Sequence, residues 1–410
     1  ADLTERTRAF IRDVVEPVEG DYLRDLAEQR RTGDPWRPLP VVEELKAEAK
    51  ARGLWNLWLP KEHAGEYAAR FGTDGGEGLT NVDYAPVAEA TGGSHLAPLV
   101  MNCNAPDTGN MEVLERYGTQ AHKDRWLGRL LEGEIRSAYV MTEPDIASSD
   151  AAQLKFRAVR DGDAYVLNGE KWWISGAGDP RCGLYIVMAM TDPDAAKHAR
   201  HTMFVMDPDT PGVEKLRPMQ VFGQDDAPHG HLHLRFTDVR VLAENVVLGE
   251  GRGFEVAQGR LGPGRIHHCM RAIGQAEKAL QMMCERGLSR EAFGKKLVEL
   301  GANYDIIANA RMEIEMARLL CLKAAWMMDT QGVRAAQPWI SKIKVVAPLM
   351  AGKVIDEAMQ LHGAGGISQD FDLAHMWTHV RTLRFADGPD AVHRRQVARA
   401  ELRKYTGNKG

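Results

Sequence analysis

The residues with the clearest chemical potential lie in one stretch, residues 139–178. It opens with Tyr-Val-Met-Thr-Glu-Pro, closes with Lys-Trp-Trp-Ile-Ser-Gly, and carries small hydroxyl side chains at Thr142, Ser148, Ser149 and Ser175. Hydroxyls and backbone N–H groups beside the indoles of Trp172 and Trp173 would suit a flat, hydrogen-bonding cofactor. Neighbours on a strand face opposite sides, so one indole is free to lie against a ring while the other packs in the core. The alternative is that both tryptophans are core residues and the loop after Thr142 is only a loop.

The elements that must hold this stretch follow from periodicity. Asp161-Gly162 and Asn168-Gly169 each lie between alternating apolar and polar residues, which predicts two hairpins with primed turns. Residues 1–137 show helical spacing, with Thr80 as the predicted N-cap of one helix, and helical spacing returns after about residue 249. Periodicity alone therefore predicts an α+β protein with strands in the middle of the chain.

Five landmarks, in a fixed order, resemble one known family. The 139–178 stretch with its two motifs is one of them. The other four are Gly-Thr-Gln at 118–120 through Leu-Glu-Gly-Glu at 131–134, Arg-Glu-Ala-Phe-Gly-Lys at 290–295, Gln-Leu-His-Gly-Ala-Gly-Gly at 360–366, and a carboxylate near the end at Asp387. Together they cover nearly the whole chain, which resembles the acyl-CoA dehydrogenases. Residues 262–271 and 386–390 are similar to the branch that animals carry fused behind a phosphotransferase-like domain. That extra domain is not among these 410 residues.

The resemblance implies a fold, a cofactor and a set of contacts. The fold would have an N-terminal α-helical domain at 1–137, a middle antiparallel β domain at 138–248 and a C-terminal four-helix-bundle domain at 249–410. The cofactor would be FAD, shared between subunits of a homotetramer or homodimer, with Arg290 and Phe293 reaching the neighbour's FAD. The cofactor-binding residues would be Tyr139, Met141, Thr142, Ser148, Ser149, Trp173, Ile174, Ser175, Arg290, Phe293, Gln360, Gly363, Ala364 and Pro389.

The implied reaction is α,β-dehydrogenation of an acyl-CoA thioester, in fatty-acid or branched-acyl catabolism. It needs a base for the α-proton and an acceptor for the β-hydride, the flavin N5. By position Asp387 matches the family's C-terminal base, usually a Glu, and the second location known in the family is excluded because 256–276 contains no acid. The shorter Asp suggests room for a long, branched or hydroxylated acyl chain. From the residues alone, the favoured role of Asp387 is that of a helix N-cap, with Pro389 in the first turn.

The substrate contacts implied by the resemblance are fewer. Arg265 stands where a family arginine helps to hold CoA, and Gly388 follows the base beside the thioester. Ser148 is a further candidate, but the loop before it is one residue longer than the common one, so the resemblance does not separate Ser148 from Ser149. Electrons would pass to an electron-transfer flavoprotein.

Composition narrows the class of protein. The net charge of −5 gives no general footprint for nucleic acid, and no apolar run is long enough for a membrane helix. Five scattered cysteines without a Cys-x-x-Cys pair fit free thiols in a reducing compartment. The polar N-terminus predicts a protein that is not secreted. We expect a cytoplasmic location in a bacterium, and a mitochondrial or peroxisomal one in a eukaryote.

Other motifs carry less weight. The glycines of 72–78 predict a loop, because no strand precedes them and their spacing differs from the dinucleotide fingerprint. His229, His231 and His233 would share one strand face, but partners for a metal are missing, and a solvated or partner-facing strand edge is the better interpretation. The basic tail at 393–404 would suit a DNA-binding relative, but Glu401 interrupts it.

Two competing functions remain at this stage. The first is a flavin-dependent oxidase or monooxygenase of the same fold that uses oxygen, and the second, weaker one is the DNA-binding relative. A nicotinamide dehydrogenase is disfavoured, because Gly-Glu-Gly-Arg-Gly at 249–253 lacks the required strand and spacing.

Overall fold

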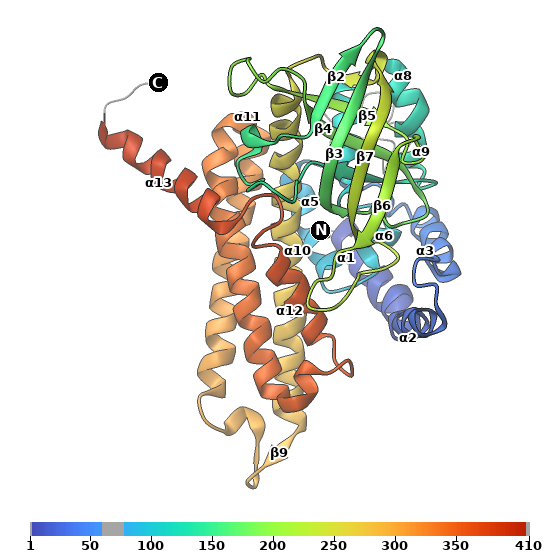
Figure 1. Ribbon diagram of the computed structural model, residues 1–410. Helices are drawn as coiled ribbons and strands as arrows, with labels where there is room; N and C mark the ends of the chain where they lie inside the picture. The colour runs from blue at the N-terminus through green and yellow to red at the C-terminus, as the bar shows by residue number, and fades with distance from the viewer. Residues whose placement is uncertain (1, 60–77, 407–410) are drawn as a thin grey trace. The chain divides into compact units, whose positions relative to one another are not determined.

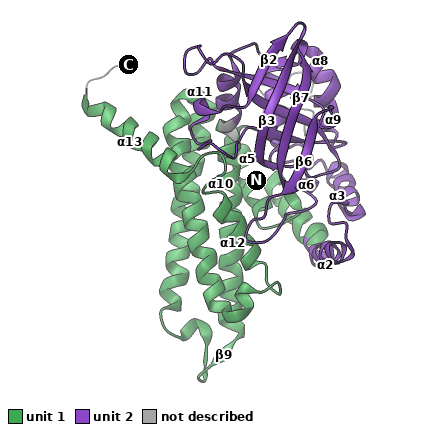
Figure 2. Ribbon diagram, viewed as in Figure 1, with its two compact units in different colours: residues 1–15, 79–98, 262–410 green, residues 16–78, 99–261 purple. Residues whose placement is uncertain are grey.

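The computed structural model describes residues 2–59 and 78–406 (Figure 1). Most of the predicted 72–78 loop lies outside the described residues. In the described parts helices come first, strands follow in the middle, and long helices return, which confirms the α+β prediction. The chain forms two compact units (Figure 2). Unit 1 contains residues 1–15, 79–98 and 262–410, and unit 2 contains residues 16–78 and 99–261. The three predicted domains therefore do not coincide with these units.

Unit 2 holds short helices and the β-sheet. Its helices are α2 (Glu16–Thr32), α3 (Pro40–Ala51), α7 (Asp107–Tyr117), α8 (Gln120–His122) and α9 (Gly128–Leu131); α6 (Ala97–Val100) begins in unit 1. Its strands are β1 (Arg136–Val140), β2 (Arg157–Asp161), β3 (Ala164–Ser175), β4 (Cys182–Met190), β5 (His201–Met206), β6 (Val213–Pro218), β7 (His231–Leu242) and β8 (Val246–Val247).

The strands of unit 2 join into one sheet in the order β6-β7-β3-β2-β4-β5-β8, and β1 adds to β4. The sheet is mostly antiparallel, as predicted, but β1 runs parallel to β4. Alternate side chains of these strands, among them Tyr165, Phe204 and Phe236, form an apolar core together with Phe156, which immediately precedes β2. The core fixes the register of β3, which carries the second motif.

Only one of the two predicted hairpin turns forms. Asp161-Gly162 joins β2 to β3, with Gly162 at φ +62°. Asn168-Gly169 instead lies inside β3, so that prediction was wrong. The Asn168 side chain bonds to Asp238 on the neighbouring strand β7, and Gly169 takes φ +134° at a register shift. A Cβ on Gly169 would come within 2.9 Å of the Phe156 ring, so the glycine serves a bulge and a close contact.

Unit 1 is helical. It comprises α1 (Asp2–Phe10), α5 (Asn81–Gly92), most of α10 (Gly253–Ser289), α11 (Asn303–His362), α12 (Leu373–Thr382) and α13 (Asp390–Thr406), with a small hairpin of β9 (Glu291–Ala292) and β10 (Lys295–Lys296). Thr80 caps α5 as predicted, because its Oγ1 accepts a hydrogen bond from the Asp83 N–H at 3.1 Å. Within the described residues, none of the helices combines the length and apolar character needed to cross a membrane.

Helix α11 is two antiparallel helices joined at Gly332. That residue has non-helical dihedral angles, φ 77° and ψ 172°. Glu313 and Lys353, which lie at similar distances in sequence from this point, form an ion pair at 2.5 Å. The chain therefore turns back sharply at Gly332, and the two halves of α11 lie side by side (Figure 1). Together with α10 and α12 they build the predicted bundle.

Helices α5 and α10 cross with their backbones in contact. A Cβ on Gly274 would lie 1.9 Å from the Glu89 carbonyl oxygen, and one on Gly92 would lie 2.1 Å from the Arg271 carbonyl oxygen. Small residues at both positions therefore set the distance between the two helices.

We expect Gly274→Ala to lower the melting temperature, because a methyl group at that crossing forces the helices apart at a cost of about 1–3 kcal/mol. Gly352→Ala, inside α11, is the matched control. Its added methyl meets only Val380 at 3.8 Å, and alanine favours the helix. Thermal unfolding followed by circular dichroism compares the two variants. Equal melting temperatures would show that the crossing tolerates a wider spacing.

Candidate active site

A buried ion pair joins the two motifs of the 139–178 stretch. Lys171 is fully buried, and its Nζ lies 3.0 Å from Glu143 Oε1. The same Nζ donates to the carbonyl oxygens of Met141 at 2.8 Å and Met188 at 2.9 Å. Burial lowers the pKa of Lys171 to about 8, and the Glu143 carboxylate opposes that shift. The cluster fixes the Thr-Glu-Pro segment against the Lys-Trp-Trp segment.

Two further contacts complete the loop between the motifs. Thr142 donates its hydroxyl proton to the Trp172 carbonyl oxygen, and the Trp172 N–H donates back to Thr142 at 3.0 Å. The Ser148 hydroxyl accepts from the Glu143 N–H at 2.9 Å, while Ser149 is exposed. The structure therefore brings Met141, Thr142 and Ser148 next to the end of β3.

Trp173 is turned outward by a bulge. Between Lys171 and Ile174, β3 has one more residue than the facing part of β7. Trp173 sits in that bulge with φ +55°, a costly conformation for a bulky residue, and it is 39% exposed. The alternative in which both tryptophans are core residues is thus wrong. Ile174 is buried, so only its backbone is available to a cofactor.

Ser175, at the end of β3, is linked to a histidine. Its Oγ lies 2.8 Å from Nδ1 of His231, whose Nε2 lies 3.4 Å from Asp226 Oδ2. His231 and His233 lie on β7, which is paired with strands on both sides, so the predicted strand edge was wrong. His229 is on the loop before β7, and burial lowers its pKa to about 4. Among the described residues, no group of three or more His, Cys, Asp or Glu is arranged to hold a metal ion.

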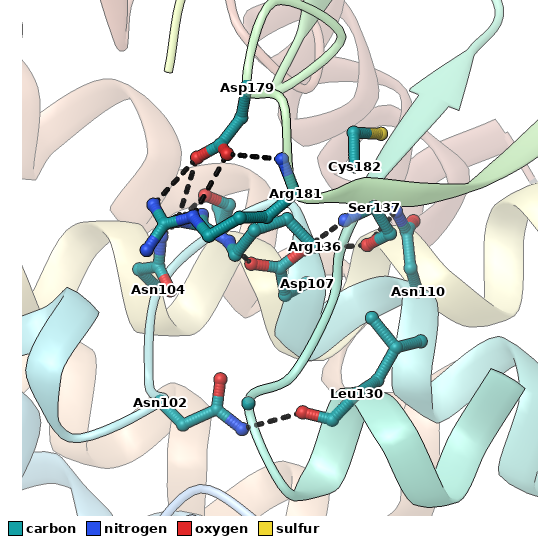
Figure 3. A network of polar contacts seen from close by, with 12 residues as sticks. Asn102, Asn104, Asp107, Asn110, Leu130, Arg136, Ser137, Asp179, Arg181 and Cys182 are labelled. Atoms are coloured by element: carbon teal, nitrogen blue, oxygen red, sulfur yellow. Dashed lines mark hydrogen bonds and ion pairs between the residues drawn. The ribbon is translucent and has the colours of Figure 1, made fainter. Parts of the chain in front are cut away.

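A second polar network holds the other end of the stretch (Figure 3). Asp107, on α7, accepts hydrogen bonds from the Ser137 N–H at 2.8 Å and the Ser137 hydroxyl at 2.6 Å, and it pairs with Arg136. Arg136 also lies 3.8 Å from Asp179, which binds Arg181 at 2.8 Å. The start of β1 and the turn after β3 are therefore anchored to the same buried charges. We infer that the network sets the position of Tyr139 and Ser175.

The donors at this end of the sheet fit a planar, hydrogen-bonding ring. An exposed indole, hydroxyl groups and strand-end backbone groups lie together, and the strained backbone at Trp173 is over-determined by its neighbours. An isoalloxazine ring has the required shape and polar edge. Of the predicted residues, Met141, Thr142, Ser148, Trp173 and Ser175 lie here, with the backbone of Ile174. Tyr139 lies on β1 with its ring against the Arg260 guanidinium.

In unit 1, Asp387 lies in a tight loop between α12 and α13. Its φ of +56° is left-handed, and Gly388 follows at φ +105°. The Asp387 carbonyl oxygen accepts from Nε of Arg265 at 2.9 Å and lies 3.3 Å from Nε2 of His393. Helix α13 begins at Asp390, three residues later, so the N-cap alternative for Asp387 was wrong. Pro389 precedes that helix, and its carbonyl oxygen accepts the His393 N–H.

Two neutral histidines contact the Asp387 loop, His268 at the side chain and His393 at the backbone, and His267, the residue before His268, is buried against the Tyr84 ring. Burial lowers the pKa of His267 and His268 to about 3 and that of His393 to about 4. Their folded pKa values are below the unfolded value of about 6.5, so between these pH limits the unfolded chain binds more protons.

We therefore expect the melting temperature to fall as the pH drops from about 6.5 to about 4, because protonation of these buried imidazoles favours the unfolded chain. Thermal unfolding across this pH range measures the effect. His393→Gln, which cannot titrate, should flatten the slope. A pH slope that is the same in His393→Gln as in the wild-type protein would contradict the burial of a neutral imidazole at this position.

The remaining predicted contacts lie at the other end of unit 1. Phe293, at φ +52° in the β9–β10 hairpin, is 96% exposed, and Arg290, Gln360, Gly363 and Ala364 are exposed as well. The Arg286 guanidinium lies over the Phe371 ring, and Phe371 packs against His362, so the two segments share one end of the bundle. From Arg265 to its end, α10 spans roughly 35 Å. This end is therefore far from Asp387 within one chain.

Sequence reasoning missed three groups that the structure brings into these sites. They are the Lys171–Glu143 pair, the His231 contact with Ser175, and His268, whose Nε2 lies 3.6 Å from Asp387 Oδ2. Signals existed for two of them. Lys171 and Glu143 both lie within the quoted motifs, and His268 lies one helical turn after Arg265.

Three profiles of known domains match the chain in succession. They are described as acyl-CoA dehydrogenase N-terminal domain at residues 1–134, middle domain at residues 138–239 and C-terminal domain at residues 251–402. The matched boundaries fall near those predicted at 137 and 248.

Individual proteins agree with these profiles. The mouse acyl-CoA dehydrogenase family member 10 is 52% identical over 98% of this chain, which spans 37% of that protein. The probable acyl-CoA dehydrogenase FadE2 of Mycobacterium tuberculosis is 49% identical over 98% of this chain and 95% of its own length. A putative acyl-CoA dehydrogenase structure from Mycobacterium abscessus matches with a TM-score of 0.93 and 51% identity, covering 99% of this chain and 98% of that one.

Proposed function

This chain belongs to the acyl-CoA dehydrogenase family, and on that premise we propose that it catalyses FAD-dependent α,β-dehydrogenation of an acyl-CoA thioester. The α C–H bond breaks and its proton passes to the Asp387 carboxylate, while the β-hydrogen leaves with its electron pair. The products are an enoyl-CoA, a protonated Asp387 and a two-electron-reduced acceptor. The observation that carries the proposal is the conformation of the Asp387 loop. Asp387 has a left-handed backbone that Arg265 and His393 contact, and its side chain is 19% exposed, so the carboxylate is partly accessible.

FAD, when bound, supplies the hydride acceptor. The residues proposed to hold its ring are Met141, Thr142, Trp173 and Ser175, with hydroxyls and backbone N–H groups along the polar edge and the indole against the flat face. The Lys171–Glu143 cluster supports the proposal, because it leaves these groups little freedom to move.

For the substrate we propose that Gly388 faces the thioester, since a side chain there would be strained by φ +105° and would lie 3.0 Å from His393. Arg265 is buried and donates to the Asp387 carbonyl oxygen, which supports a role in holding the loop that carries the base. Its predicted contact with CoA and that of Ser148 with substrate stay predictions.

We further propose a homo-oligomer, a dimer or tetramer, in which Arg290, Phe293, Gln360, Gly363 and Ala364 bind the FAD of a neighbouring subunit. Two features support this. These residues are exposed and far from the same chain's Asp387, and α11 exposes an apolar stripe at Met312, Met316, Leu319 and Trp326. An electron-transfer flavoprotein would receive the electrons, in catabolism of fatty or branched acyl chains.

One experiment tests the function. The purified holoprotein is mixed anaerobically with saturated acyl-CoAs of different length and branching, and the flavin absorbance is followed. A dehydrogenase should bleach with at least one of them and form the enoyl-CoA. Its product-bound reduced flavin should reoxidise quickly with an electron-transfer flavoprotein and slowly with oxygen. Rapid reoxidation by oxygen would favour an oxidase instead, and the absence of bleaching with every acyl-CoA would overturn the proposal.

A further inference from the structure

Asp387 faces a row of residues on α10. Gly264, Arg265, His268 and Arg271 recur at three or four along the helix and so share one face. A Cβ added to Gly264 would lie 3.9 Å from Asp387 Oδ2, and the same oxygen lies 3.6 Å from Nε2 of His268. Arg265 donates to the Asp387 backbone. The carboxylate therefore lies beside the turn at Gly264, with an imidazole one turn further along.

The tautomer of His268 follows from its other neighbour. Nη2 of Arg271 lies 3.4 Å from Nδ1 of His268. A guanidinium only donates, so Nδ1 must be the unprotonated nitrogen that accepts. The proton of the neutral ring is then on Nε2, the nitrogen that faces Asp387. The distance of 3.6 Å is longer than a hydrogen bond, and a small side-chain movement would close it, as is common when substrate enters an active site.

His268 also stays neutral at working pH. Burial, together with the charges of Arg271, Lys344 and His379, lowers its pKa to about 3, and the Asp387 carboxylate opposes that shift. Two further charged or titratable side chains, Arg265 and His393, contact the backbone carbonyl oxygen of Asp387. A neutral ring with its proton on Nε2 donates a hydrogen bond and does not compete for the substrate proton.

We propose that His268 is a positioning residue for the base: its Nε2–H holds one carboxylate oxygen of Asp387, so that the other oxygen is presented to the α-carbon. The inference rests on the proposed function. It assigns to His268 the hydrogen bond that would orient the Asp side chain, which is shorter than the usual Glu. A donor to the ionised form stabilises it and so keeps the base ionised to lower pH. In the reaction the oxygen presented to the α-carbon takes the α-proton, and the Nε2–H bond to the other oxygen persists.

The test compares four variants of the holoprotein. His268→Leu removes the donor. His268→Gln places an amide N–H near the Nε2 position, whereas His268→Asn places it near Nδ1, so the two differ only in where the donor lies. His267→Leu is the matched control, because His267 is the residue before His268 and is a buried histidine that packs against the Tyr84 ring. Bound FAD and melting temperature show which variants fold.

The readouts are the pH profile of kcat/KM for anaerobic flavin reduction and the exchange of the substrate α-hydrogen with deuterated water. We expect His268→Leu and His268→Asn to lower kcat about 10- to 100-fold with little change in KM, to slow exchange similarly, and to move the acid limb up by about one pH unit. His268→Gln should restore most of the rate and the limb. The control should keep the wild-type limb.

The outcomes separate the two proposals. An active wild-type enzyme whose acid limb and exchange rate are the same in His268→Asn and His268→Gln would overturn the inference and leave the function intact. If His268→Leu does not fold, the comparison of His268→Asn with His268→Gln tests the inference without it. A wild-type protein that neither bleaches nor exchanges with any acyl-CoA would overturn the proposed function, and the inference with it.

Discussion

Replacing Asp387 by Asn is expected to lower kcat for flavin reduction by about 10²- to 10⁴-fold, because the amide has no basic oxygen to take the α-proton. The loop should survive the change. Both Arg265 and His393 contact the backbone oxygen of Asp387, which the substitution leaves in place. Asn also tolerates the left-handed φ of +56° better than most residues. We therefore expect wild-type FAD content and nearly the same melting temperature. Stopped-flow absorbance with the best acyl-CoA measures the rate.

Asp390→Asn is the control for the loss of a carboxylate at this place in the chain. Asp390 is three residues away, at the start of α13, and its side chain pairs with Arg384 at 2.7 Å. This variant should keep most of the activity and lose some stability. If Asp387→Asn were as fast as Asp390→Asn, the base would have to be another residue.

Local signals in the sequence predicted local structure well. Thr80 was found as an N-cap because capping depends on four consecutive residues. Asp161-Gly162 was found as a turn for the same reason. The identical signal at Asn168-Gly169 failed, because Asp238 on a distant strand binds the Asn168 side chain and the Phe156 ring requires a glycine there. A dipeptide cannot show which of these two uses of Asn-Gly applies.

The candidate sites show the same division. The motifs indicated which residues would face a cofactor, but not the bulge that exposes Trp173, since a bulge is visible only against the partner strand β7. The residues alone favoured Asp387 as a helix N-cap, but α13 begins three residues later, at Asp390. His231 and His268 were missed because their partners are 56 and more than 100 residues away in the chain.

The largest expected loss of stability comes from Lys171→Met. It would leave the Glu143 carboxylate buried without its cation, at a cost of about 3–5 kcal/mol. In a protein of this size each kcal/mol changes the melting temperature by about 2–4 °C, so we expect the melting temperature to fall by roughly 10 °C. Glu143→Gln should cost less. An amide oxygen in the Oε1 position still accepts from the Phe156 N–H and from Lys171 Nζ, and only the Lys155 N–H loses its acceptor.

The double variant separates the pair from its surroundings. Lys171→Met with Glu143→Gln should be more stable than the sum of the single changes predicts, because neither charge is then buried alone. Arg240→Met tests an exposed pair of the same sheet, Arg240–Asp161, and should change stability by less than about 1 kcal/mol. Additive losses in the double variant would mean that Lys171 acts chiefly through the carbonyl oxygens of Met141 and Met188. In either case the Met141–Thr142 backbone loses its anchor, so FAD should dissociate more readily from Lys171→Met than from Arg240→Met. The fluorescence of free flavin after dilution of each holoprotein measures this dissociation.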